Sequence, residues 1–133
     1  MESQKFILVT GGAGYIGSHT VVALCNMGLT PVIIDDLRNA SGRVIDNLEK
    51  ITQKRIIHYR LDCCKEENLE YLFNKFDFQA VIHFAAYKAV GESVAEPLKY
   101  YQNNLSSLIN VLSFAQKCKV DNIVFSCLLY TSP

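Results

Sequence analysis

The feature that most constrains the fold of this chain is a cluster of four glycines directly after an apolar run near its start. The residues read Phe6-Ile7-Leu8-Val9-Thr10-Gly11-Gly12-Ala13-Gly14-Tyr15-Ile16-Gly17. The apolar run is typical of a buried strand, and the amphipathic segment after the glycines is typical of a helix. A strand that turns through glycines into a helix is the layout of a dinucleotide-binding turn.

Two glycine patterns overlap in this turn. Gly12, Gly14 and Gly17 fit G-x-G-x-x-G, while Gly11, Gly14 and Gly17 fit a G-x-x-G-x-x-G spacing. In the first pattern, the first glycine permits the tight turn and the second lets a pyrophosphate approach the backbone. The third lets the helix pack against the strand. The amides and positive dipole end of the helix would then face the phosphates.

An acidic residue ends the next apolar run, Thr30-Pro31-Val32-Ile33-Ile34-Asp35. Asp35 follows Gly17 by 18 positions, close to the ~20-residue offset at which a carboxylate binds the adenosine ribose hydroxyls. Such a carboxylate would repel a 2′-phosphate, so the sequence favours NAD over NADP, although Arg38 and Arg43 nearby weaken that preference. The alternative is an ordinary glycine turn with a helix-capping Asp35. It is disfavoured because strand, glycines, helix and acid come in the expected order.

Composition limits the class of protein. The chain has 133 residues, half of them hydrophobic, which is enough for one domain with a core. Its 13 basic residues balance its 13 acidic ones, so neither nucleic acid nor a membrane surface is expected as a partner. No apolar run reaches the ~20 residues of a membrane span, and no signal-peptide pattern opens the chain. A cytoplasmic protein is therefore expected.

The cysteines and histidines predict neither a disulfide framework nor a metal site. The cysteines are odd in number and form no C-x-x-C pair, and the three histidines lack ligand spacing. We expect reduced, mostly buried thiols and no bound metal. The cysteines are Cys25, Cys63, Cys64, Cys118 and Cys127.

Strand and helix patterns alternate along the chain, without a repeat or a linker. Strands are predicted at 5–10, 30–35, 55–61, 79–85 and 120–126. Helices are predicted at 15–28, 41–53, 65–75 and 97–117. This alternation predicts an α/β, doubly wound parallel sheet of the Rossmann-like type, with strand order 3-2-1-4-5. A ligand should bind beyond the carboxyl ends of the strands, where strands one and four diverge. An apolar stripe on the last helix is expected to face the core: Leu98, Tyr101, Leu105, Leu108, Leu112 and Ala115.

A second group of candidate residues follows the fourth predicted strand. The chain there reads Val81-Ile82-His83-Phe84-Ala85-Ala86-Tyr87-Lys88-Ala89-Val90-Gly91-Glu92-Ser93. The strand ends in small residues, so the backbone could approach a ligand at the predicted crevice. Lys88 follows in a loop at the same mouth, where a cation could pair with the pyrophosphate or a ribose hydroxyl. The residues alone leave open that Lys88 is a solvated surface charge.

Together, Thr10 to Gly17, Asp35 and His83 to Ser93 resemble the extended short-chain dehydrogenase/reductase superfamily. Within it, H-F-A-A-Y-K-A-V-G-E-S, followed by Pro97-Leu98-Lys99-Tyr100-Tyr101-Gln102-Asn103-Asn104, is similar to the UDP-glucose 4-epimerases. The resemblance covers roughly residues 5–126 and implies NAD as cofactor.

The resemblance also implies which residues contact the cofactor. The pyrophosphate turn would comprise Gly11, Gly14, Tyr15, Ile16 and Gly17. The adenosine half would be held by Asp35 at the ribose, with Asp36 and Asn39 beside it, and by Asp62 and Cys63 at the adenine. The fourth strand would contribute Phe84, Ala85 and Lys88, and the last helix would place Asn103 near the nicotinamide.

The activity that the resemblance implies is inversion of the C4 hydroxyl of UDP-hexoses, the interconversion of UDP-galactose and UDP-glucose in galactose metabolism. A homodimer is implied for the full-length protein. The family's base is the Tyr of a Y-x-x-x-K pair that follows strand five, aided by a Ser or Thr. The Y-x-x-x-K pair in this chain, Tyr71 and Lys75, comes before strand four. We therefore interpret it as a packed tyrosine and a surface lysine, and we assign no catalytic residue.

The end of the chain departs from the family pattern. Leu128 stands where the family's catalytic Ser is expected. We therefore expect residues 1–126 to be an incomplete NAD-binding domain, truncated after strand five, and residues 127–133 to be a non-native tail. The catalytic pair and the substrate domain would lie beyond residue 133. Two other interpretations remain: another sugar-nucleotide enzyme such as a 4,6-dehydratase, against which K-A-V-G-E-S argues, and a catalytically inactive NAD-binding module.

Overall fold

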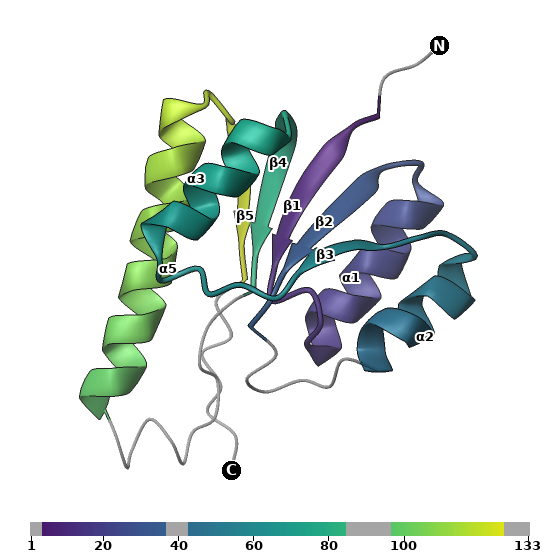
Figure 1. Cartoon of the computed structure of the whole chain (residues 1–133), viewed down its shortest axis with the longest axis horizontal. Coiled ribbons are helices and arrows are strands. Elements are labelled where there is room, and N and C mark those ends of the chain that lie inside the picture. The colour runs from purple at the N-terminus through teal and green to yellow at the C-terminus, as the bar shows by residue number, and fades with distance from the viewer. Residues whose placement is uncertain (1–3, 37–42, 85–96, 127–133) are drawn as a thin grey trace.

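Five strands and four helices alternate along the chain in the computed structural model, which describes residues 4–36, 43–84 and 97–126 (Figure 1). The strands are β1 (Phe6–Thr10), β2 (Thr30–Ile34), β3 (Ile57–Tyr59), β4 (Phe78–His83) and β5 (Asn122–Phe125). The helices are α1 (Tyr15–Asn26), α2 (Arg43–Thr52), α3 (Glu66–Lys75) and α5 (Pro97–Lys117). Every described element was predicted, with β3 considerably shorter than expected.

The strands form one parallel sheet in the order β3-β2-β1-β4-β5, which confirms the predicted topology. The first strand of the sequence is therefore the central one. Thr10, its last residue, lies level with Ile34 of β2 and His83 of β4. The carboxyl ends of the three strands consequently meet at one edge of the sheet, directly before the glycine turn (Figure 1).

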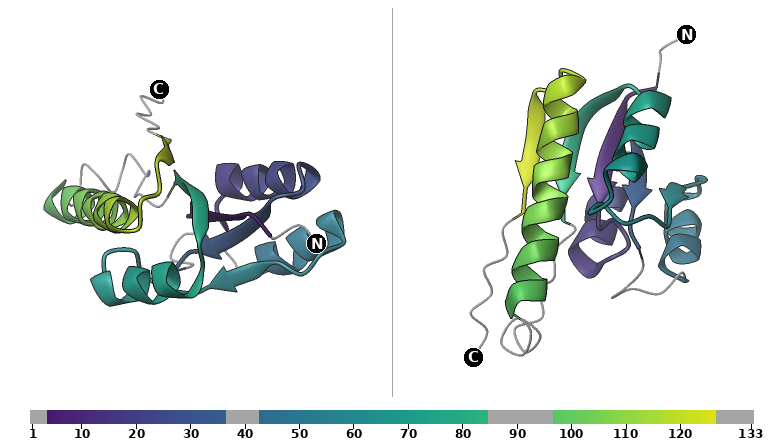
Figure 2. Two further views of the ribbon diagram at one scale, coloured as in Figure 1. Left: turned by 90° about the horizontal axis from the view of Figure 1, so that it is seen from above. Right: turned by 60° about the vertical axis from the view of Figure 1, so that its left-hand side comes forward.

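Helices cover both faces of the sheet (Figure 2). The direction of the crossovers explains why, because a right-handed connection changes face when the strand order reverses after β3. On one face, α1 and α2 pack on residues such as Val9 and Ile33. On the other face, α3 and α5 pack on Leu8, Val32 and Val81. Each strand of the sheet centre is thus apolar on both sides, as buried parallel strands require.

Helix α1 stops where the sequence predicts. Gly28 has φ 79°, a left-handed conformation in which only glycine is unstrained. The amide of Gly28 donates to the carbonyl of Cys25, and the amide of Leu29 donates to that of Leu24. These hydrogen bonds satisfy the last carbonyls of the helix and direct the chain into β2.

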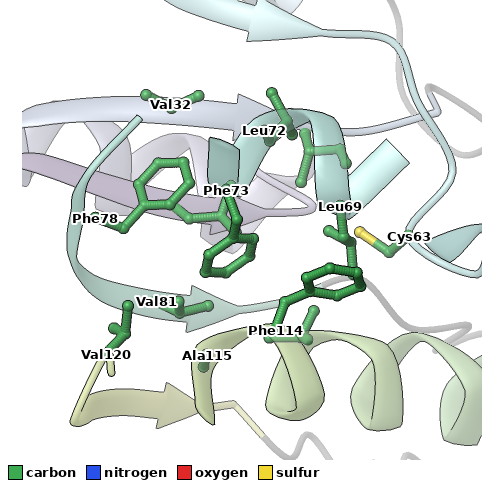
Figure 3. Close-up of a cluster of buried hydrophobic side chains, with 13 residues drawn as sticks. Val32, Cys63, Leu69, Leu72, Phe73, Phe78, Val81, Phe114, Ala115 and Val120 are labelled. Atoms are coloured by element: carbon green, nitrogen blue, oxygen red, sulfur yellow. The ribbon is translucent and has the colours of Figure 1, made fainter. Parts of the chain in front are cut away.

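The predicted apolar stripe of α5 is largely wrong. Ala115 is buried as predicted, but Leu98, Leu105 and Leu112 are exposed, and so is Ile109. The other side chains of α5 described as buried are Ser107, Val111 and Phe114. Figure 3 shows Phe114 and Ala115 packed beside Val81 and Phe73. Helix α5 carries apolar residues around much of its circumference, so the pattern did not identify the side that packs on the sheet.

Two further expectations concern the whole chain. The four cysteines in the described ranges are all free thiols, as predicted. Only Cys25 and Cys63 are buried, whereas Cys118 is exposed. None of the helices found in these ranges is both long enough and apolar enough to cross a membrane.

Candidate dinucleotide site

The glycine turn starts at Gly11, which has φ 70°. The Gly11 amide donates to the carbonyl of Ile34 at 2.8 Å, and the Gly11 carbonyl accepts from the amide of Gly14 at 3.1 Å. A left-handed conformation directly after a buried strand requires glycine. The residue that permits the tight turn is therefore Gly11, and not Gly12 as the G-x-G-x-x-G pattern suggests.

Gly12 and Gly17 are required by packing inside the protein. A Cβ at Gly12 would lie 2.8 Å from Cγ1 of Ile33, a side chain that is fully enclosed. A Cβ at Gly17 would lie 2.9 Å from the Cα of Gly12 and would overlap the Gly11 carbonyl oxygen. Any larger residue at either position would push the start of α1 away from the sheet, which is the role predicted for Gly17.

Gly14 is different, because the protein itself leaves room for a side chain there. A Cβ at Gly14 would meet only the Gly11 carbonyl oxygen, at 3.4 Å, which is ordinary contact. Its backbone, with φ −75° and ψ 176°, is open to any residue. Neither packing nor conformation therefore explains this glycine, whereas the close approach of a ligand to the backbone does.

The first turn of α1 is suited to an anion. Gly14 is its N-cap residue, no side chain caps the helix, and no acidic residue lies in the first turn. The amide of Ser18 makes the first intrahelical bond, to the Gly14 carbonyl. The amides before it have no partner within the helix, and they carry the positive end of the helix dipole. This arrangement fits a pyrophosphate, with Tyr15, Ile16 and Gly17 supplying backbone amides.

Asp35 lies beside this turn. Its amide donates to the Tyr59 carbonyl at 3.1 Å, which places it directly after β2 at the edge where β3 ends. Its Oδ2 accepts a hydrogen bond from the amide of Ala13, also at 3.1 Å. This hydrogen bond holds the partly buried carboxylate against the glycine turn, although Ala13 and Asp35 are 22 positions apart in the sequence. A ribose bound next to the pyrophosphate would lie within its reach.

A cavity of about 440 Å³ lies between the ends of β2 and β3 and the start of α3. Acidic and basic side chains line it together, and Arg60 is oriented by a hydrogen bond from its Nε to the Asp36 carbonyl at 3.4 Å. Its lining residues are Asp36, Arg60, Leu61, Asp62, Lys65, Glu67 and Asn68. The sequence singled out Asp36 and Asp62, but gave no signal for Arg60 or Asn68.

Asp62 and Cys63, predicted as a pair, play separate parts. The Oδ1 atom of Asp62 accepts from the Cys64 amide at 2.9 Å, which folds the chain into a tight turn before α3. The Cys63 side chain instead belongs to the core, and Figure 3 shows its sulfur pointing toward Leu69 and Phe114. Cys63 can therefore line the cavity only through its backbone.

Burial raises the pKa of the Cys63 thiol far above its ordinary value, and the neighbouring carboxylate of Asp62 raises it further. Asp35 and Asp36 add smaller contributions of the same sign. The thiol is consequently neutral at physiological pH and unsuited to act as a nucleophile. The carboxylates of Asp35, Asp36 and Asp62 thus all lie near Cys63, at the carboxyl end of the sheet. Their negative charge disfavours a ligand that carries an additional phosphate there.

A buried polar network that the sequence did not reveal joins β1 to β4. The hydroxyl of Thr10 accepts from the Phe84 amide at 2.9 Å and lies 2.7 Å from Nδ1 of His83. Both side chains are fully buried, and the His83 ring stacks on Phe125 of β5 at 5.7 Å between centroids. The only indication of this network in the sequence is that the apolar strands β1 and β4 each end in a polar residue, Thr10 and His83. The network fixes the end of the sheet at which β4 ends and the glycine turn begins.

The remaining predicted residues are placed less fully. Phe84 is buried in the cluster beneath α1 and α2, so its backbone lies closest to the predicted crevice. Tyr15 is the first residue of α1, and Asn103 lies within α5. Asn39, Ala85 and Lys88 lie outside the described residues, as do the last seven residues.

Tyr71 and Lys75 form a surface pair on α3. Lys75 Nζ donates to the Tyr71 hydroxyl at 3.3 Å and lies 5.5 Å from the ring centroids of Tyr59 and Tyr71. The tyrosine is half exposed, and its ring packs edge-on against Tyr59. Hydrogen bonds from Lys75, first to Tyr59 and then to Tyr71, raise the pKa of the lysine. The pair therefore favours a protonated lysine at the protein surface.

Comparison with known proteins agrees with this geometry. A family model described as GDP-mannose 4,6 dehydratase matches residues 8–131. The UDP-glucose 4-epimerase of Dictyostelium discoideum is 48% identical over 90% of this chain and 35% of its own length. The bifunctional protein GAL10 of Pachysolen tannophilus is 50% identical over 92% of this chain and 18% of its own.

Solved structures show the same relationship. The UDP-glucose 4-epimerase of Bifidobacterium longum, crystallised with NAD+ and UDP, superposes with a TM-score of 0.89 at 42% identity. The match covers 92% of this chain and 36% of that one. The chain thus spans about a third or less of the length of these relatives. Fold, glycine turn and sequence identity together show that the chain belongs to the extended short-chain dehydrogenase/reductase superfamily, among the UDP-glucose 4-epimerases.

Proposed function

We propose that the chain is the NAD-binding part of an isomerase that interconverts UDP-galactose and UDP-glucose by inverting the C4 hydroxyl of the sugar. The observation that best supports NAD binding concerns Gly14. The protein does not need this glycine for its own packing, and it lies at the N-terminus of a helix that no side chain caps. Relatives of the same fold have been crystallised with NAD, and a relative that is 48% identical to this chain is named UDP-glucose 4-epimerase.

The residues of this chain would bind and orient the cofactor. The backbone from Gly14 to Gly17 would hold the pyrophosphate, and Asp35 would accept hydrogen bonds from the adenosine ribose. The cavity beside Asp62 would receive the adenine. When bound, NAD supplies the acceptance and return of a hydride, and the protein supplies orientation and a base. We propose that this base and the sugar-binding remainder lie outside residues 1–126, and that the full-length protein is a homodimer.

An exposed surface on α5 supports the homodimer. Leu98, Leu105, Ile109 and Leu112 form an exposed apolar surface along α5, and such surfaces in monomeric domains mark contacts with further protein. We also propose a cytoplasmic protein, for which the free thiols of the described chain are the support.

The related 4,6-dehydratases are the second candidate, because the matching family model takes its description from one. Both functions need the same NAD half, so cofactor binding does not separate them. The relatives that favour an epimerase are similar over nine-tenths of this chain.

The test has two parts. Calorimetric titration of the 133-residue chain with NAD measures binding, with Gly14→Val as the control that blocks the pyrophosphate. A chimera that joins residues 1–126 to the carboxy-terminal part of the Dictyostelium relative then measures turnover. We expect the chimera to convert UDP-galactose and to leave GDP-mannose unchanged. A folded chimera that retains NAD but converts no UDP-sugar would contradict the proposal.

A further inference from the structure

The turn after β3 is held at several points by side chains from two different helices. The carbonyl of Asp62 accepts from the Lys65 amide at 3.2 Å and from Nδ2 of Asn68, in α3, at 3.0 Å. The next carbonyl, that of Cys63, accepts from Nδ2 of Asn110, in α5, also at 3.0 Å. Two consecutive peptide groups are therefore fixed by asparagine amides from two different helices, α3 and α5.

Asn110 differs from Asn68 in its place. Asn68 lines the cavity between β2, β3 and α3, so it could touch a ligand itself. Asn110 does not belong to the cavity wall, and it lies 47 residues beyond the carbonyl that it holds. Its neighbour Val111 is buried in the core, which anchors this part of α5 on the sheet. Asn110 can therefore affect the cavity only through the turn.

The turn in question sets the position of a carboxylate. The Cys63 carbonyl and the Cys64 amide belong to one planar peptide group, so fixing the carbonyl also fixes the direction of the amide. The Cys63 side chain is held in the core, and the Cys64 amide donates to Oδ1 of Asp62 at 2.9 Å. That hydrogen bond fixes the rotamer with which Asp62 faces the cavity. Without Asn110, the peptide group between Cys63 and Cys64 would lose the hydrogen bond to its carbonyl, and its orientation would be held less firmly.

We propose that Asn110 is a positioning residue for the adenosine half of the dinucleotide: from α5 it holds the Cys63 carbonyl and thereby the Asp62 carboxylate in the cavity wall. The inference rests on the proposed function, because it takes the cavity to be the adenosine site. It adds that Asn110 sets the affinity for the cofactor without touching it.

The decisive variant is Asn110→Leu, which keeps the size of the side chain and removes its donor. Loss of one hydrogen bond to an ordered peptide group corresponds to a roughly three- to tenfold rise in the Kd for NAD. AMP, used as a probe of the adenosine half alone, should lose affinity by the same factor. Asn110→Gln retains an amide and should restore most of the affinity.

Matched controls separate positioning from a general effect on stability. Gln116→Leu makes the equivalent change at an exposed position of α5, and Asn74→Leu does so at an exposed position of α3. Both should bind NAD and AMP like the unaltered chain. Thermal unfolding of every variant reports the folded fraction, to which each Kd is corrected. If Asn110→Leu does not fold, Asn110→Ser, which is too short to reach the carbonyl, takes its place.

Amide hydrogen exchange of Cys64 and Lys65 without ligand gives a second readout, and Asn110→Leu should reduce their protection. Equal Kd values for Asn110→Leu and the unaltered chain would overturn the inference and leave the proposed function standing. An equal loss in Gln116→Leu would also overturn it. If the unaltered, folded chain binds neither NAD nor AMP, the proposed function itself fails, and the inference fails with it.

Discussion

The four glycines of the turn fall into three groups that only the structure distinguishes. Gly11 is required by a left-handed backbone, Gly12 and Gly17 by the absence of space for a Cβ, and Gly14 by neither. A substitution at Gly17 therefore affects folding, whereas one at Gly14 affects binding. The two positions allow the cofactor site to be tested separately from the stability of the domain.

The first prediction compares these two glycines. Gly14→Val should leave the domain folded and reduce NAD affinity by at least about a hundredfold, because the branched side chain would occupy the space of the pyrophosphate. Gly17→Ala should instead lower the free energy of unfolding by about 1–3 kcal/mol, since its Cβ overlaps the turn. Circular dichroism, thermal unfolding and calorimetry measure these effects. Unchanged NAD binding by folded Gly14→Val would show that the phosphates bind elsewhere.

The second prediction concerns cofactor choice. Asp35→Asn keeps an oxygen for the Ala13 amide but removes the negative charge. We expect NAD affinity to fall about tenfold, in line with the loss of a hydrogen bond to a charged group. The preference for NAD over NADP should shrink because the repulsion of a 2′-phosphate is reduced. Parallel titrations with both nucleotides measure the ratio, and equal affinities for both in the unaltered chain would remove the role given to Asp35.

Residue-level prediction from the sequence succeeded where spacing and chemistry coincide. Asp35 lies against the glycine turn, as its distance from Gly17 implied. The division of roles between Gly11 and Gly12 could not be predicted, because two overlapping patterns fit the same letters. Cys63 was placed at the correct turn, but the side on which its thiol lies depends on the packing of α3 and α5.

At the scale of the elements, α5 shows how a pattern can fail. A long helix with apolar residues on several sides offers more than one stripe, and the stripe chosen from the sequence is largely exposed. The buried side includes Ser107, a polar residue that bonds to the Asn104 carbonyl and so fits into the core. Hydrophobic periodicity predicted the length of the helix but could not distinguish its buried side from its exposed apolar side.

Helix α3 carries the third prediction. Tyr71→Phe removes the hydroxyl that accepts from Lys75, so the pKa of the lysine should fall toward its ordinary value, while Tyr59 keeps part of the shift. NAD affinity should not change. A raised lysine pKa stabilises the folded state below the ordinary value of 10.5, and this contribution disappears as the pH rises through the raised pKa. Titration of the lysine by NMR measures the shift, and weaker NAD binding by Tyr71→Phe would mean that the pair belongs to the site.

The whole molecule supplies the fourth prediction. The described residues present a site for a dinucleotide, but their Tyr–Lys pair is the surface pair Tyr71 and Lys75 on α3, and the base is proposed to lie outside residues 1–126. The 133-residue chain should therefore bind NAD without interconverting UDP-galactose and UDP-glucose. A coupled assay with folded protein measures this. Turnover above the level without protein, persisting in Tyr71→Phe, would show that the chain contains a base that we have not identified.

The topology was the most predictable property of the molecule. Alternating strands and helices, the handedness of crossovers and the position of the glycines leave one strand order, and the structure has it. The bounds of β3 were the exception. Only Ile57 to Tyr59 pair with β2, because an edge strand has one neighbour and ends where that neighbour turns away.

The central position of β1 has a consequence for synthesis on the ribosome. One neighbour, β2, follows within twenty residues, but the other, β4, begins at Phe78, 68 positions after Thr10. At about 5–20 residues per second, roughly 3–14 seconds pass between the two strands. During that interval one edge of β1, with Ile7, Leu8 and Val9, has no partner strand. Strand β1 must therefore be protected from aggregation until β4 arrives to enclose it.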